Sequence, residues 1–62
     1  MTLVTVKPEA LLPGDPVFIG KTKWTVRVIE GPDQMDTYDL YLSNENGDCH
    51  MVVRDPIQLI NE

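Results

Sequence analysis

The side chains best suited to chemistry in this chain are one cysteine and one histidine, which stand next to each other. Cys49 and His50 are the only residues of their kinds among the 62. A structural zinc site needs about four Cys or His ligands, and an intramolecular disulfide needs a second thiol. We therefore expect no metal, no cofactor and no disulfide. Neighbouring side chains of a strand point to opposite faces, so His50 is not placed to activate the Cys49 thiol. Because no other nucleophile has a placed base, we also expect that the protein is not an enzyme.

A second candidate for chemistry is a stretch of acidic residues in the middle of the chain. Carboxylates can bind calcium, but this stretch lacks the residue spacing of a calcium-binding loop. We expect a solvated acidic surface, which either keeps the protein soluble or meets a basic partner. The residues of this surface are Glu30, Asp33, Asp36 and Asp39.

The balance of charge argues against several classes of partner. The net charge is −5, with five cations against ten acids. Residues 1–29 hold four cations and two acids, whereas residues 30–62 hold one cation and eight acids. Binding to nucleic acid or to an anionic membrane depends on Lys and Arg. Direct nucleic-acid binding and membrane contact are therefore not expected.

The cellular compartment is inferred from what the sequence lacks. No run of residues reaches the roughly 18 apolar positions of a membrane span. The first residues have neither the basic start nor the long apolar stretch of a signal peptide. A single thiol suits a reducing compartment. We expect a cytoplasmic protein, which would mean the host cytoplasm if a phage encodes it.

The elements that must position these side chains are short β segments separated by turn signals. Alternating apolar residues bounded by Gly, Pro, Asn and Asp are typical of strands. Pro8 suits the first position of a helical turn. We expect one domain over residues 1–62, folded as a five- to six-stranded, partly open antiparallel barrel of the SH3-like kind, with an OB-fold as the weaker alternative. The expected strands cover residues 3–7, 17–20, 23–30, 37–43, 48–54 and 57–60.

Alternation along the strands predicts which side chains face the core, because successive side chains point to opposite faces of a sheet. Trp24 and the residues at even spacing after it are apolar, and so are alternate residues from Tyr38 and from Cys49. Cys49 is expected to pack among them as a small hydrophobe. The predicted core is Val17, Ile19, Trp24, Val26, Val28, Tyr38, Leu40, Leu42, Met51 and Val53.

The loop over residues 44–47 joins two of these strands, and two registers are compatible with it. A four-residue loop places Leu42 opposite Cys49 and Leu40 opposite Met51. A two-residue Asn46-Gly47 turn, which is a strong hairpin signal, instead places Leu42 opposite Met51. Both registers keep apolar residues opposite apolar residues, and a slip by one residue would not.

Three apolar residues fall on the outer face, where alternation predicts solvent. These are Ile29, Tyr41 and Val52, and Arg27 and His50 would flank them. Tyr and Arg are enriched at binding hot spots. A contiguous apolar patch indicates a partner site. The alternative is a half-buried face, covered by a loop or by a second copy of the chain.

One segment resembles a recurring opening of small SH3-like barrels. Residues 12–17 read Leu-Pro-Gly-Asp-Pro-Val, and residues 20–26 look like the next hairpin of such a barrel. The resemblance covers roughly residues 10–60 and extends to short phage and bacterial accessory proteins. It implies a fold and carries no function. Nucleic-acid-binding barrels of this kind are usually basic, and this chain is acidic.

Three functional hypotheses follow. The leading one is a protein-interaction module, which binds a host or phage protein through the outer face or by adding a strand to an open sheet edge. The second is an acidic inhibitor that mimics nucleic acid and occupies a basic site. The third is a small structural component of a virion, which self-associates.

Overall fold

The computed structural model describes residues 2–61 and shows an all-β chain, as expected. Each strand begins and ends within one residue of its expected position. Pro8 occupies the start of a short 3-10 helix, η1. The elements are β1 (Thr2–Val6), η1 (Pro8–Ala10), β2 (Pro16–Ile19), β3 (Thr22–Glu30), β4 (Tyr38–Asn44), β5 (Gly47–Val53) and β6 (Ile57–Asn61).

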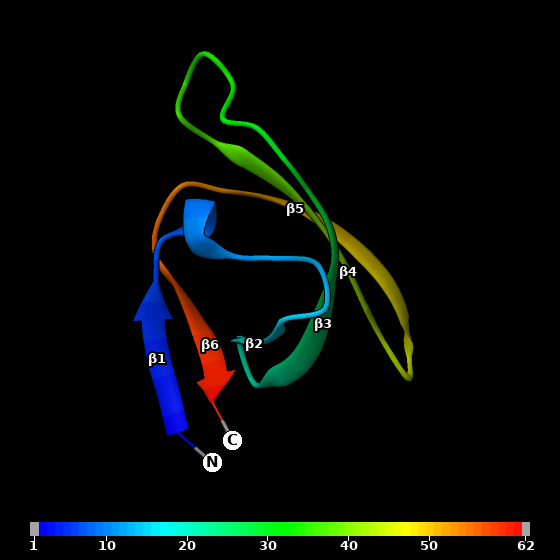
Figure 1. Ribbon diagram of the computed structural model, residues 1–62. Helices are drawn as coiled ribbons and strands as arrows, with labels where there is room; N and C mark the ends of the chain where they lie inside the picture. Colours follow the sequence, from blue (N-terminus) through cyan, green and yellow to red (C-terminus); the bar gives the residue numbers. More distant parts are fainter. Residues whose placement is uncertain (1, 62) are drawn as a thin grey trace.

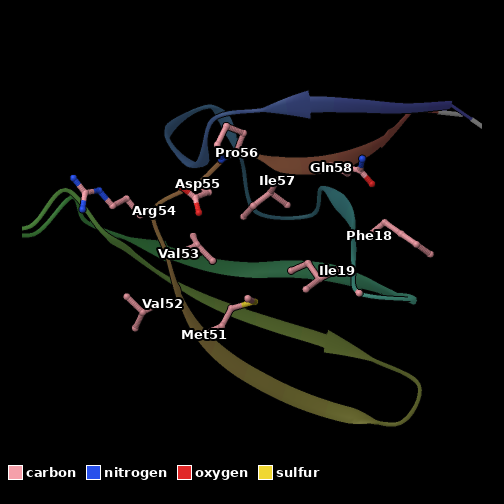
Figure 2. Close-up of a pocket in the computed structure, with 11 residues that line it drawn as sticks. Phe18, Ile19, Met51, Val52, Val53, Arg54, Asp55, Pro56, Ile57 and Gln58 are labelled. Atoms are coloured by element: carbon pink, nitrogen blue, oxygen red, sulfur yellow. The ribbon is translucent and has the colours of Figure 1, made fainter.

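All six strands belong to one antiparallel sheet with the order β1-β6-β2-β3-β4-β5. Strands β2 to β5 follow one another as hairpins, and β6 returns to pair with β2 (Figure 1). The sheet curls, so that β1 and β6 lie across the core from β3, β4 and β5 (Figure 2). Within residues 2–61 no ladder joins β1 to β5. The sheet is therefore open, and the closure expected of a barrel is not observed.

The core lies between the two halves of this curled sheet. Four of the ten predicted core residues are fully buried, namely Val17, Val26, Leu40 and Leu42. Ile19, Trp24, Met51 and Val53 are half-buried and pack against them, and Tyr38 is half-buried. Three buried hydrophobic residues lie outside the predicted set, namely Leu11 just after η1, and Ile57 and Ile60 of β6.

A β-bulge in β3 overturns two of the predicted faces. Val26 lies opposite Leu42, but Val28 lies opposite the very next residue of β4, Tyr41. The extra residue, Arg27, shifts the alternation by one position. Val28 is therefore exposed, and its assignment to the core is wrong. Ile29 now packs against the core, so its assignment to the outer face is wrong as well.

The turn before β2 is hydrogen-bonded to β3 next to this bulge. The amide N–H of Gly14 donates to the carbonyl of Val26 over 2.7 Å, and the Val26 N–H donates to the carbonyl of Asp15 over 2.9 Å. Gly14 has a φ of 96°, a conformation that favours glycine. The Asp15 carboxylate accepts a bond from the Leu12 N–H over 2.8 Å, which holds the turn together.

The β4–β5 hairpin adopts the first of the two predicted registers. Leu42 lies opposite Cys49 and Leu40 opposite Met51, whereas the register with an Asn46-Gly47 turn is not formed. The ladder extends to the pair Asn44 and Gly47, so the turn itself consists of Glu45 and Asn46. The Asn44 side-chain oxygen accepts a bond from the Asn46 N–H over 2.8 Å, which favours this turn over the alternative.

Candidate functional site

The outer face of β3, β4 and β5 carries the largest set of exposed apolar side chains near one another. Val28 is 44%, Tyr41 38% and Val52 58% exposed. Val28, Tyr41 and His50 are consecutive partners across the three strands. Val52 follows His50 on the same face of β5, where it is a diagonal neighbour of Tyr41. We call Val28, Tyr41, His50 and Val52 the outer patch.

Two contacts fix the imidazole of His50 in the outer patch. The ring stacks on Tyr41 with 4.5 Å between ring centroids and 9° between ring planes. Its Nε2 atom lies 3.0 Å from Oδ1 of Asp39, and the two side chains are 48% and 40% exposed. A polar contact this exposed contributes little to stability. Its effect is to orient the imidazole, and with it one flank of the Tyr41 ring.

Arg27 lies at the other side of the outer patch because of the bulge. As the extra residue of β3, it has no partner residue in β4. Its Nε donates a hydrogen bond to Oγ of Ser43 over 2.7 Å, which holds the guanidinium against the sheet. Together with Tyr41 and His50 it lines a shallow groove of about 620 Å³. The structure thus brings together four of the five predicted interaction residues, Arg27, Tyr41, His50 and Val52.

Val28 takes the position that the alternation pattern assigned to Ile29. Sequence reasoning missed it because a single inserted residue reverses both faces of a strand. The available signal was the adjacent apolar pair Val28-Ile29. Neighbouring side chains of a regular strand face opposite sides of the sheet, so only one of this pair could face the core. The bulge before the pair turns Ile29 inward and Val28 outward.

Among the acidic residues, Asp33 organises the loop between β3 and β4. Its Oδ1 accepts bonds from the amides of Met35 over 2.9 Å and of Thr37 over 3.1 Å, and its Oδ2 accepts one from the Thr37 hydroxyl over 2.7 Å. These bonds, the Thr37 side chain first, lower the pKa of Asp33 below its ordinary value because they favour the ionised carboxylate. The Asp33 carboxylate therefore has a structural role in the loop.

The other three residues of the predicted acidic surface are dispersed. Glu30 lies opposite Asp39 across the β3–β4 ladder, and Asp39 contacts His50. Asp36 lies in the loop with a φ of 59°. Over residues 2–61 no group of three or more His, Cys, Asp or Glu side chains could hold a metal ion.

Cys49 lies on the opposite face of β5 from His50. It is half-buried, pairs with Leu42 and packs against the core, as predicted. Its thiol lies 3.9 Å from the His50 backbone carbonyl, which is a weak contact. The two residues that could do chemistry are thus held apart by the pleat of the strand.

Comparison with protein-family models, with curated proteins and with solved structures found no match for this chain. The described part of the chain contains no helix with the length and apolar character needed to cross a membrane.

Proposed function

We propose that the protein is a non-enzymatic interaction module, which binds a partner protein through the outer patch. The observation that carries the proposal is the row of Val28, Tyr41 and His50 across three neighbouring strands, with Val52 beside it. Apolar side chains at these positions are exposed although β3 and β4 bury Val26, Leu40 and Leu42 on their other face. Contiguous exposed apolar surface is typical of partner sites.

The chemistry of the outer patch supports a protein partner. A tyrosine supplies a large, rigid apolar surface at a low cost in side-chain entropy, and arginine supplies directional hydrogen bonds. The stacked His50 ring and the Arg27–Ser43 bond hold these groups in place before binding. Preorganisation of this kind reduces the free-energy cost of association.

The wider identity that we propose is a small SH3-like accessory protein of the phage or bacterial kind, acting in the cytoplasm. Its support is the Leu-Pro-Gly-Asp-Pro-Val opening at residues 12–17. The return of β6 to pair with β2 after a run of hairpins is compatible with that proposal.

The test is affinity capture from a host lysate with the wild-type chain and with Tyr41→Ala. The Tyr41 ring lies outside the core, so we expect the variant to lose less than about 1 kcal/mol of stability. We expect its binding to the captured partner to weaken by about 1–2 kcal/mol or more, the range of a hot-spot aromatic. Circular dichroism and calorimetric titration of the identified partner give the two quantities.

Leu12→Ala is the matched control, because Leu12 is an apolar residue that is 65% exposed, lies before β2 and is not part of the outer patch. A partner that binds wild type and Leu12→Ala equally but Tyr41→Ala weakly supports the proposal. Equal binding by all three chains contradicts it. Affinity for the partner that falls steeply as salt is added, but is unchanged by Tyr41→Ala, would instead favour the acidic inhibitor hypothesis.

A further inference from the structure

We propose that two copies of this chain associate by pairing their β5 strands antiparallel, with Met51 on the two-fold axis. The sheet would then run continuously from one subunit into the other. This inference goes beyond the proposed function, because it concerns the edge of the sheet and its occupant, and it does not require the outer patch to bind anything.

The outer edge of β5 is unpaired and lacks the usual protection against strand pairing. Strand β5 ends the sheet and pairs with β4 alone among the described residues. Natural proteins protect exposed edges with Pro, Lys or a bulge. The β5 segment has neither Pro nor Lys, and its register with β4 runs from Gly47 to Val53 without a bulge. The edge is therefore regular and free to accept another strand.

An apolar groove lies beside this edge. A groove of about 510 Å³ opens between the end of β5 and β2 (Figure 2). Ile19, Met51 and Val53 line it, and all three are half-buried side chains that pack against the core. A strand added to β5 would place its own inward-facing side chains over this partly covered edge of the core.

Strand β5 can pair with the β5 strand of a second copy in a register that keeps the faces of the sheet. With Met51 on the axis, Cys49 lies opposite the partner's Val53, and His50 lies opposite the partner's Val52. Inward-facing side chains meet inward-facing side chains, which preserves the faces of the sheet. Such an interface is isologous, so every contact occurs twice.

Charge complementarity selects this register over its neighbours. In it, Asp48 lies opposite the partner's Arg54, the residue that directly follows β5, and the two-fold axis repeats the pair. Opposite charges across a ladder stabilise strand pairing. With His50 on the axis, Asp48 would lie opposite the partner's Val52. With Val52 on the axis, Asp48 would lie opposite the partner's Pro56 and would again have no cation opposite it.

The other edge strand, β1, has no comparable feature. Its five residues, Thr2–Val6, carry no charge, so self-pairing of β1 would have no charged pair to set a register. The same edge leads directly into Lys7 and Pro8, two residue types that discourage strand pairing. The occupant of the β5 edge is thus a second β5.

The experiment is sedimentation equilibrium of the full chain and of charge-exchange variants. We expect wild type to dimerise and Asp48→Arg or Arg54→Asp to raise the dimer dissociation constant by about tenfold or more, because each creates two like-charge pairs. The double variant D48R/R54D restores opposite charges and should dimerise as wild type does. Both side chains are exposed, and circular dichroism verifies that each variant is folded.

Glu45→Arg is the control for Asp48→Arg. It replaces an acid by arginine in the same way, but at an exposed turn residue outside the pairing. We expect it to dimerise at least as well as wild type. A wild type that stays monomeric up to about millimolar concentration overturns the proposal. Single variants that dimerise normally, or a double variant that does not, overturn it too.

The same measurement separates this inference from the proposed function. Dimerisation that is lost in Tyr41→Ala but unaffected by the charge variants would mean self-association through the outer patch, and the β5 pairing would be wrong. Dimerisation that responds to the charge variants, together with a Tyr41→Ala chain that binds its captured partner normally, would uphold the β5 pairing and reject the outer patch.

Discussion

Val28 lies directly opposite Tyr41 in the β3–β4 ladder, although Val26, two residues earlier, lies opposite Leu42. The intervening residue of β3, Arg27, is the bulge that makes this possible. Without it, Val28 would point into the core and Ile29 would point to solvent. One residue therefore decides both which side chains stabilise the fold and which are presented on the outer face.

The bulge predicts unequal costs for two adjacent truncations. Ile29→Ala should lower the free energy of unfolding by about 1–3 kcal/mol, because a half-buried side chain that packs on the core is removed. Val28→Ala, at an exposed position, should cost about 0.5 kcal/mol or less. Urea denaturation of both variants gives the two values. A larger cost at Val28 than at Ile29 would show that the bulge does not form.

Leu40 is predicted to be among the most sensitive positions of the core. It is fully buried, so Leu40→Ala should cost about 2–5 kcal/mol. A domain of this size has a margin of only about 3–5 kcal/mol, so much of the population should unfold. Far-ultraviolet circular dichroism with urea titration checks this, and Met35→Ala, at a residue 70% exposed, is the control. Unchanged melting of Leu40→Ala would refute the face assignment of β4.

Gly31 is predicted to tolerate no side chain. Its φ is 128°, and an added Cβ would lie 2.9 Å from the Thr37 carbonyl oxygen and 3.2 Å from Tyr38. Gly31→Ala should therefore cost about 1–3 kcal/mol through backbone strain and the clash. Gly20→Ala is the control, since Gly20 has a φ of 63° and open space around its Cα. Thermal melts that rank Gly20→Ala as the more damaging change would contradict this account of the loop.

The Asp33 loop predicts a pH dependence with a definite sign. Its folded-state pKa lies below the ordinary value of 3.8, first because of the Thr37 side-chain hydrogen bond and then because of backbone bonds from Thr37 and Met35. A depressed folded pKa means that the contribution to stability is complete above the unfolded-state pKa and is lost as the pH falls through the folded-state pKa. Acid should therefore loosen this loop.

Thr37→Val tests the cause of this shift, because it removes the hydroxyl and keeps the shape of the side chain. The pKa of Asp33, followed by NMR of its carboxyl carbon, should rise toward 3.8. In Thr37→Ser, which keeps the hydroxyl, the pKa should stay low. Equal pKa values in the two variants would show that the Thr37 side chain is not the main cause.

Much of this protein could be read from local pattern. The strands are separated by Gly, Pro, Asn and Asp signals, and strict alternation in β4 and β5 assigned Leu40, Leu42 and Cys49 to the inward face. These predictions hold because they depend on nearest neighbours along the chain, whose side chains alternate in any regular strand. The register of the β4–β5 hairpin was reduced to two choices by the same logic.

Tertiary structure decided the rest. The choice between the two hairpin registers depended on the turn at Glu45-Asn46 and the Asn44 side-chain bond. The exposure of Val28 depended on a bulge where β3 is hydrogen-bonded to Gly14 and Asp15. Whether the sheet closes depended on whether β1 pairs with β5, and within the described residues no ladder joins these two strands. The bulge and the open edge are set by contacts between segments far apart in the chain, which a local alternation pattern does not encode. The hairpin register is set by a side-chain bond within the turn, which alternation of apolar residues does not encode either.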